Sequence, residues 1–136
     1  MVKFESSVKV IPFNQERVYD KLSDLNNLES IKDRLPQDKI KNLSFDSDSL
    51  SINVSPVGDL TLKIIERESP KCIKLEAVKS PLPFNMWIQL VSASDEECKL
   101  KITIGVEVNP FMKAMVQKPL QEGVEKMADM LSMIQY

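Results

Sequence analysis

Few side chains in this sequence belong to the types that carry out acid–base, nucleophilic or metal chemistry. The 136 residues include no histidine, and the two cysteines, Cys72 and Cys98, lie far apart in the chain. Histidine is the most common general base near neutral pH, and a structural zinc site needs closely spaced cysteines. Three scattered glycines form no phosphate-binding loop. We therefore predict no metal site and no cofactor, and favour a binding protein over a catalyst.

Two polar side chains are candidates for a place inside a pocket. Ser6 alternates with apolar neighbours, so its hydroxyl could orient a ligand or could bond to the local backbone. Glu66 continues the alternation of residues 60–64 and is a weak candidate for a general acid or base. The adjacent pair Ile64 and Ile65 could equally introduce a bulge and leave Glu66 exposed at a rim.

The first forty residues predict one strand and two short helices. Apolar residues alternate over residues 2–11, which indicates a half-buried strand that ends at Pro12. Asn14 is a suitable N-cap for a helix that carries Val18, Tyr19 and Leu22 at helical spacing. A second short helix should follow, ended by Pro36, and its apolar residues are Leu25, Leu28, Ile31 and Leu35.

The middle of the chain predicts an antiparallel sheet. From about residue 40 to 108 apolar and polar residues alternate, and turn-forming residues interrupt the pattern at 46–49, 55–58, 68–71, 79–83 and 92–97. These interruptions define six further strands, seven in all. One face of the sheet should be apolar and buried (the dry face), and the other should be polar and exposed to solvent (the wet face). Cys72 and Cys98 fall on strands separated by another strand, too far apart for a disulfide, so both should be free thiols.

The last segment predicts one long helix. Asn109 is a suitable N-cap, and Pro110 occupies the first helical position, where its missing N–H costs nothing. Pro119 should kink or divide this helix. The apolar residues recur at three and four positions and form one stripe: Met112, Val116, Leu120, Val124, Met127, Leu131 and Ile134.

This order of elements resembles the START-like superfamily, also called polyketide cyclase-like or SRPBCC. Two local stretches carry the resemblance in addition to the architecture: residues 18–25 (VYDKLSDL) after the first strand, and Asn109-Pro110-Phe111 before the long helix. The resemblance spans the chain and implies the helix-grip fold, an α+β fold in which a curved seven-stranded antiparallel sheet wraps around a long C-terminal helix. Members bind lipids, sterols, hormones, quinones or polyketides between sheet and helix, and some convert what they bind.

A hollow between sheet and helix would need an occupant. An empty apolar cavity costs about 24 cal/mol per Å³, so about 400 Å³ would consume roughly 10 kcal/mol, against a net domain stability of about 5–15 kcal/mol. Methionine suits such a wall because its thioether adapts to different shapes. The alternative for every wall residue is ordinary packing in a closed core. The candidate ligand-binding residues are Ser6, Leu62, Leu75, Phe84, Met86, Ile88, Met112, Val116, Leu120 and Met127.

We therefore predict a carrier or sensor that binds a lipid-like or aromatic small molecule without catalysis. A cyclase or hydrolase that uses Glu66 and bound water is an alternative. A second alternative is a protein-binding module that docks through the methionine-bearing helix or through Trp87, which falls on the wet face with Asn85 and Gln89.

Composition narrows the possible partners. The chain is 43% hydrophobic and 28% charged, as in soluble globular domains, and its length suits a single START-like domain over residues 1–136. The net charge is -2 and the basic residues are dispersed, so nucleic acid is not expected as a partner. No apolar run reaches the roughly 18 residues of a spanning helix, so we expect no stable membrane insertion. The N-terminus has no secretion signal pattern, and we expect a cytoplasmic protein.

Overall fold

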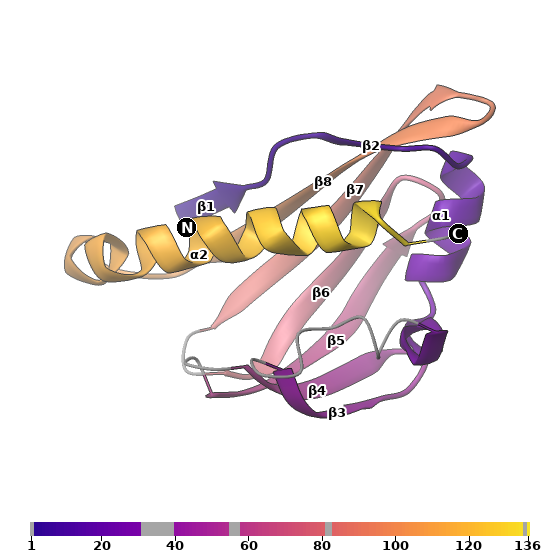
Figure 1. Cartoon of the computed structure of the whole chain (residues 1–136). Coiled ribbons are helices and arrows are strands. Elements are labelled where there is room, and N and C mark those ends of the chain that lie inside the picture. Colours follow the sequence, from indigo (N-terminus) through magenta and orange to yellow (C-terminus); the bar gives the residue numbers. More distant parts are fainter. Residues whose placement is uncertain (1, 31–39, 55–57, 81–82, 135) are drawn as a thin grey trace.

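The fold is an antiparallel sheet with one long helix across its inner face (Figure 1). The computed structural model describes residues 2–30, 40–54, 58–80, 83–134 and 136. The strands run β1-β8-β7-β6-β5-β4-β3, and β2 also pairs with β8. This confirms the predicted α+β architecture. The elements are β1 (Val2–Glu5), β2 (Lys9–Ile11), α1 (Gln15–Leu22), the 3-10 helix η1 (Leu25–Ser30), β3 (Ile40–Phe45), β4 (Ser49–Val54), β5 (Gly58–Glu68), β6 (Cys72–Lys79), β7 (Phe84–Ser94), β8 (Glu97–Val106) and α2 (Pro110–Ser132).

The first predicted strand is two strands separated by a bulge, so the prediction of one continuous strand over 2–11 was wrong. Glu5 pairs with Thr103, and Lys9 pairs with Leu100. Lys9 follows Glu5 by four residues, whereas Leu100 and Thr103 are only three residues apart on β8, so the N-terminal segment contains one extra residue. One extra residue reverses the facing of all side chains beyond it. Val8 and Val10, expected on the dry face, are consequently exposed, and Ile11 is fully buried instead.

The two short helices begin where the sequence predicts. The Asn14 side chain accepts hydrogen bonds from the N–H groups of Glu16 (2.9 Å) and Arg17 (3.3 Å), which satisfies donors that the first turn of α1 leaves free. Helix α1 buries Val18 and Tyr19. The second helix is a 3-10 segment, and the remainder of the predicted helix, with Ile31, Leu35 and Pro36, lies outside the described residues.

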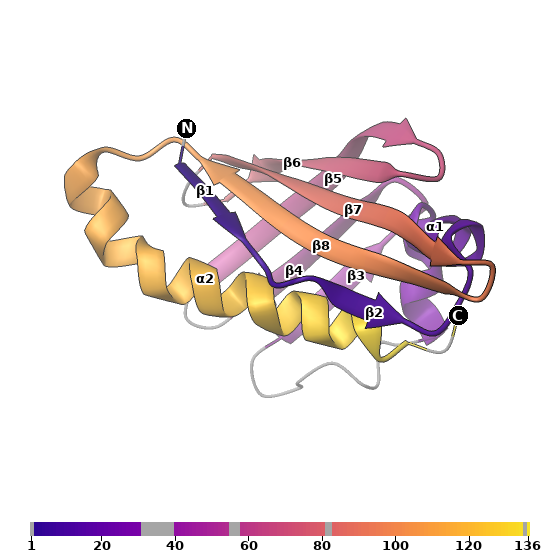
Figure 2. The ribbon, with the colours of Figure 1, turned by 90° about the horizontal axis from the view of Figure 1, so that it is seen from above.

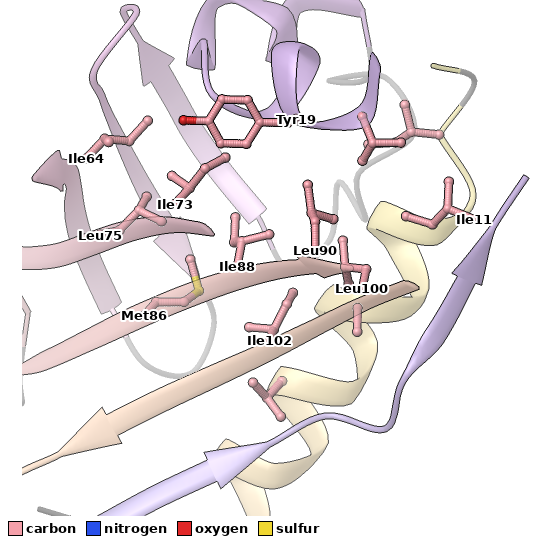
Figure 3. Packing of buried hydrophobic residues seen from close by; sticks show 14 of the residues in the cluster. Ile11, Tyr19, Ile64, Ile73, Leu75, Met86, Ile88, Leu90, Leu100 and Ile102 are labelled. Atoms are coloured by element: carbon pink, nitrogen blue, oxygen red, sulfur yellow. The ribbon is translucent and has the colours of Figure 1, made fainter. Parts of the chain in front are cut away.

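The inner face of the sheet carries the core. Figure 3 shows side chains from adjacent strands, among them Leu75, Met86 and Ile88, on the same side of the sheet. Their sequence neighbours Lys74, Trp87 and Gln89 alternate onto the outer face. Strands β6 and β8, which carry Cys72 and Cys98, are separated by β7, and both thiols are free, as predicted.

Helix α2 begins at the predicted cap and runs without interruption. The side chain of Asn109 accepts a hydrogen bond from the N–H of Met112 at 2.8 Å, and Pro110 opens the helix. The helix continues through Pro119, so the proline does not divide it, and Figure 2 shows that its axis bends. Helix α2 packs against β8, β1 and β2, at one edge of the sheet. No helix in the described part of the chain has both the length and the apolar character to cross a membrane.

Candidate ligand-binding site between the sheet and helix α2

The candidate wall residues of the sheet lie together in one apolar cluster. Because alternate residues of an antiparallel strand share a face, neighbouring strands present their apolar side chains to the same space. Leu75 pairs with Met86, and Met86 pairs with Ile104 on the next strand. The buried wall residues are Leu62, Leu75, Met86 and Ile88, and the half-buried residues packed against them include Phe84, Leu120 and Met127.

The two halves of α2 differ in how they meet this cluster. Val124 and Ala128, in the second half, are fully buried. In the first half Met112 and Val116 are only half-buried, and neither belongs to the core cluster of described residues. The structure therefore brings Leu120 and Met127 onto the sheet but leaves the first half of the predicted stripe loosely packed.

The open spaces next to these residues are small or shallow. A hollow of about 30 Å³ lies between α1, η1 and the end of α2, lined by Leu22, Leu25, Leu28, Leu131 and Ile134 among others. This volume holds one or two water molecules. A shallow depression of about 350 Å³ follows one side of α2 and is lined mainly by polar residues of that helix alone, so it does not enclose a ligand. Within the described ranges, side chains fill the space between the sheet and the second half of α2.

Ser6 is buried, but its hydroxyl is committed to the backbone. It donates to the carbonyl of Ser7 at 2.9 Å and accepts from the N–H of Ile102 at 2.9 Å. A serine hydroxyl has a single hydrogen to donate. Ser6 therefore stabilises the bulge between β1 and β2 and has no donor left for a ligand.

Glu66 lies outside the apolar face. A register shift between Ile64 and Glu66 places Glu66 opposite Lys74, on the side of the sheet that carries Trp87. The carboxylate is exposed, as in the rim alternative. The burial that an acid–base role in the cavity requires is therefore missing.

Trp87 lies on the outer face, where the alternation places it. The ammonium groups of Lys3 and Lys74 lie 5.8 and 5.4 Å from the centre of its ring, within range of cation–π attraction. The ring is half-buried and packs between these two side chains. Trp87 is therefore separated from the inner face by the sheet itself.

A polar clamp that the sequence did not reveal holds the second half of α2 to the bulge. We define the clamp as Ser7, Lys9, Glu125 and Asp129. Glu125 accepts hydrogen bonds from the N–H and the hydroxyl of Ser7. The Lys9 ammonium lies 3.1 Å from Glu125 Oε2 and 2.6 Å from Asp129 Oδ1. The spacing of Glu125 and Asp129 is typical of neighbours on a helix, but their partners come from the other end of the chain.

The contacts within the clamp shift the pKa values of Glu125 and Lys9. The hydrogen bond from the Ser7 N–H, followed by the one from Lys9, holds the pKa of Glu125 below its ordinary value of 4.5. Hydrogen bonds to Asp129 and Glu125 raise the pKa of Lys9 above 10.5. A depressed carboxyl pKa contributes stability above the unfolded value, whereas a raised ammonium pKa contributes below it. The stabilising contributions of Glu125 and Lys9 are therefore both present between about pH 4.5 and 10.5.

We expect Glu125→Gln to lower the free energy of unfolding near neutral pH and to have a diminishing effect below pH 4.5. The reason is that protonation of Glu125 in the wild-type protein removes the same ionic contacts. Urea denaturation at a series of pH values measures the difference. Glu122→Gln makes the same change of charge on an exposed position of the same helix and serves as the control. Equal losses of unfolding free energy in both variants at every pH would contradict a stabilising role of the clamp.

No described group of side chains forms a metal site. Among the described residues, no three histidine, cysteine, aspartate or glutamate side chains lie close enough together to hold a metal ion. Burial raises the pKa values of the Cys72 and Cys98 thiols. A raised pKa disfavours the thiolate, which is the form that binds metals and attacks electrophiles.

Comparison with known proteins identifies the fold. No protein-family model matches the sequence, and no curated protein matches it significantly. Norcoclaurine synthase from Thalictrum flavum, in complex with dopamine and hydroxybenzaldehyde, is similar in structure, with a TM-score of 0.76, 17% identity, and coverage of 96% of this chain and 85% of that one. A START superfamily protein from Mycobacterium smegmatis is similar with a TM-score of 0.63 and 12% identity, and the match covers 95% of this chain and 98% of that one. A conserved protein from Geobacillus kaustophilus is similar with a TM-score of 0.62 and 21% identity, and the match covers 96% of this chain and 90% of that one.

These likenesses extend over nearly the whole chain at low identity, so what they establish is the fold. The chain has the helix-grip fold of the START-like proteins, as the resemblance predicted.

Proposed function

We propose that the protein binds a small apolar molecule between the inner face of the sheet and the first half of α2. The observation that carries this proposal is the uneven packing of the helix. Val124 and Ala128 are the fully buried residues of α2, while Met112 and Val116 are half-buried outside the core cluster. An apolar stripe that its own fold leaves incompletely covered can be covered by a ligand.

Entry of a ligand requires a local movement, and the described contacts allow one. The clamp holds the second half of α2, whereas the residues before Leu120 make fewer buried contacts and open at lower cost. Met86, Met112 and Met127 can then repack around the guest. We further propose that the protein acts in the cytoplasm, where its free thiols would stay reduced.

The proposal concerns binding without catalysis. The carboxylate considered for acid–base chemistry, Glu66, is exposed and faces away from the cluster. The structurally similar norcoclaurine synthase was determined with dopamine and hydroxybenzaldehyde, so aromatic compounds are suitable first probes alongside fatty acids.

Met112→Gln should weaken binding of an apolar fluorescent probe about tenfold. Complete burial of an exposed methionine side chain stabilises by about 1.5–3 kcal/mol. Met112 is already half-buried, so burial of the remainder against a ligand contributes roughly half of this, up to about 1.4 kcal/mol, which is a tenfold change in Kd. The matched control is Met115→Gln, the same change at an exposed position of the same helix, which should leave Kd unchanged. Fluorescence titration measures both.

Equal affinities of the two variants would contradict the assigned position of the ligand. Native mass spectrometry of protein purified from cells, followed by solvent extraction, identifies any molecule that the wild-type protein retains. We expect an apolar compound whose occupancy falls in Met112→Gln and is preserved in Met115→Gln. A wild-type protein that binds no apolar probe would contradict the proposed function itself.

A further inference from the structure

One phenol group of the core has an unused hydrogen-bond donor. Tyr19 of α1 is 4% exposed and belongs to the apolar cluster on the inner face of the sheet. Within the described part of the chain, its hydroxyl forms no hydrogen bond. Every fully buried side-chain nitrogen or oxygen of the described residues has a partner, so this hydroxyl touches a small accessible space. A tyrosine hydroxyl in a core usually finds a partner. The donor at the tip of this buried ring is therefore available to a ligand.

The ring of Tyr19 directs its hydroxyl toward the candidate wall of the ligand site. Figure 3 shows the ring over Ile73, with the hydroxyl on the side of Ile64. Ile64 pairs with Leu75, and Leu75 pairs with Met86 on the next strand. Leu75 and Met86 are candidate ligand-binding residues. The unused donor therefore lies beside the row of apolar side chains that the ligand would contact.

The surroundings of this hydroxyl favour a neutral acceptor over an anion. Burial is the main cause that raises the pKa of Tyr19 above its ordinary value of 10.0, so the phenol stays protonated near neutral pH and can donate. Arg67 lies opposite Ile73 in register, but its guanidinium is already paired with Asp48 at 2.7 Å. A carboxylate placed against Ile64 and Ile73 would lose its hydration while the nearby positive charge is balanced. A neutral carbonyl loses much less hydration energy.

We propose that the Tyr19 hydroxyl donates a hydrogen bond to a neutral carbonyl oxygen of the bound molecule. The apolar part of that molecule lies against Leu75 and Met86. This inference rests on the proposed function and adds the chemical class of the ligand, an apolar ketone or ester. One placed polar group fixes the orientation of a guest that apolar contacts alone would hold in several orientations.

The test is fluorescence titration of the full chain with the aromatic ketone Prodan and with its analogue in which a methylene group replaces the carbonyl. Tyr19→Phe removes the hydroxyl and keeps the ring. We expect the Kd of the ketone to rise about fivefold and the Kd of the analogue to stay unchanged. The emission of this ketone moves to longer wavelength when its carbonyl accepts a hydrogen bond. The bound ketone should therefore emit at shorter wavelength in Tyr19→Phe than in the wild-type protein.

Tyr136→Phe is the matched control, because Tyr136 is the other tyrosine of the chain and its hydroxyl already donates to the carbonyl of Leu131 at 2.7 Å. This variant should lose thermal stability and bind both probes as the wild-type protein does. Tyr19→Phe should not lower the midpoint of thermal unfolding, since it breaks no hydrogen bond within the described structure. Circular dichroism measures both midpoints.

The two probes distinguish failure of this inference from failure of the proposed function. If Tyr19→Phe leaves the Kd of the ketone unchanged, or weakens ketone and analogue equally, the role of Tyr19 is overturned, while binding of the analogue still supports the proposed function. Met112→Gln should weaken both probes alike, because it acts on the apolar contact. A wild-type protein that binds neither probe would overturn both proposals.

Discussion

Leu100→Ala should lower the free energy of unfolding by about 2–5 kcal/mol, a large fraction of the roughly 5–15 kcal/mol that stabilises a domain. Leu100 is fully buried on β8, where its backbone pairs with Lys9 on one side and Leu90 on the other. Figure 3 shows it on the inner face beside α2. Truncation removes apolar contacts and leaves a hollow that two paired strands and a helix cannot readily close.

Urea denaturation followed by circular dichroism measures the effect, with Val91→Ala as the control. Val91 pairs with Lys99, next to Leu100 in the same strand pair, but it points to the outside and is 62% exposed. Its truncation should change stability by less than about 0.5 kcal/mol. A comparable loss in both variants would show that the buried face does not dominate the stability of the sheet.

Pro119→Ala should raise the free energy of unfolding by up to about 3 kcal/mol. Proline inside a helix lacks the N–H that would bond to the carbonyl of Met115, and its ring clashes with that turn. Pro119 is exposed, so its replacement removes no buried packing. The same substitution should straighten α2 and, if the bend keeps the first half apart from the sheet, weaken binding of the apolar probe.

Gly123→Ala separates the bend from simple helix stabilisation. A Cβ at Gly123 would meet no atom within 4 Å, and alanine is favoured over glycine in a helix by about 1 kcal/mol. This variant should be more stable and should bind the probe as the wild-type protein does. Thermal unfolding measures the stability of both variants, and probe titration measures whether binding depends on the bend or on helix stability. If Pro119→Ala binds the probe with unchanged affinity, the bend in α2 has no role in ligand binding.

Local patterns were sufficient for most of the secondary structure. Asn14 and Asn109 cap the helices that follow them, because an asparagine oxygen satisfies N–H groups that any helix leaves free. The alternation in residues 84–90 predicts which side chains of β7 face the core, because a strand has a period of two residues. The bulge at Ser6 to Val8 was missed, since the extra residue is visible only against the register of β8.

The candidate site was less predictable, because it also depends on contacts between segments that are far apart in the sequence. The stripe on α2 is evident from residue spacing, but how deeply each member is buried depends on where the helix lies across the sheet. Val124 is buried and Met112 is half-buried although both occupy the stripe. Ser6 was correctly placed on the buried side, but its bond to Ile102, 96 residues away, could not be read from its neighbours.

The sequence by itself determined the element order, the dry face of the sheet and the shortage of catalytic side chains, because these depend on residue types and on spacing within a few residues. Tertiary structure alone decided the bulge, the outward position of Glu66, the clamp and the exposure of Phe111 and Met115. Each of these depends on which distant segment lies opposite, and the pairing of distant segments is set by the packing of the whole sheet and helix.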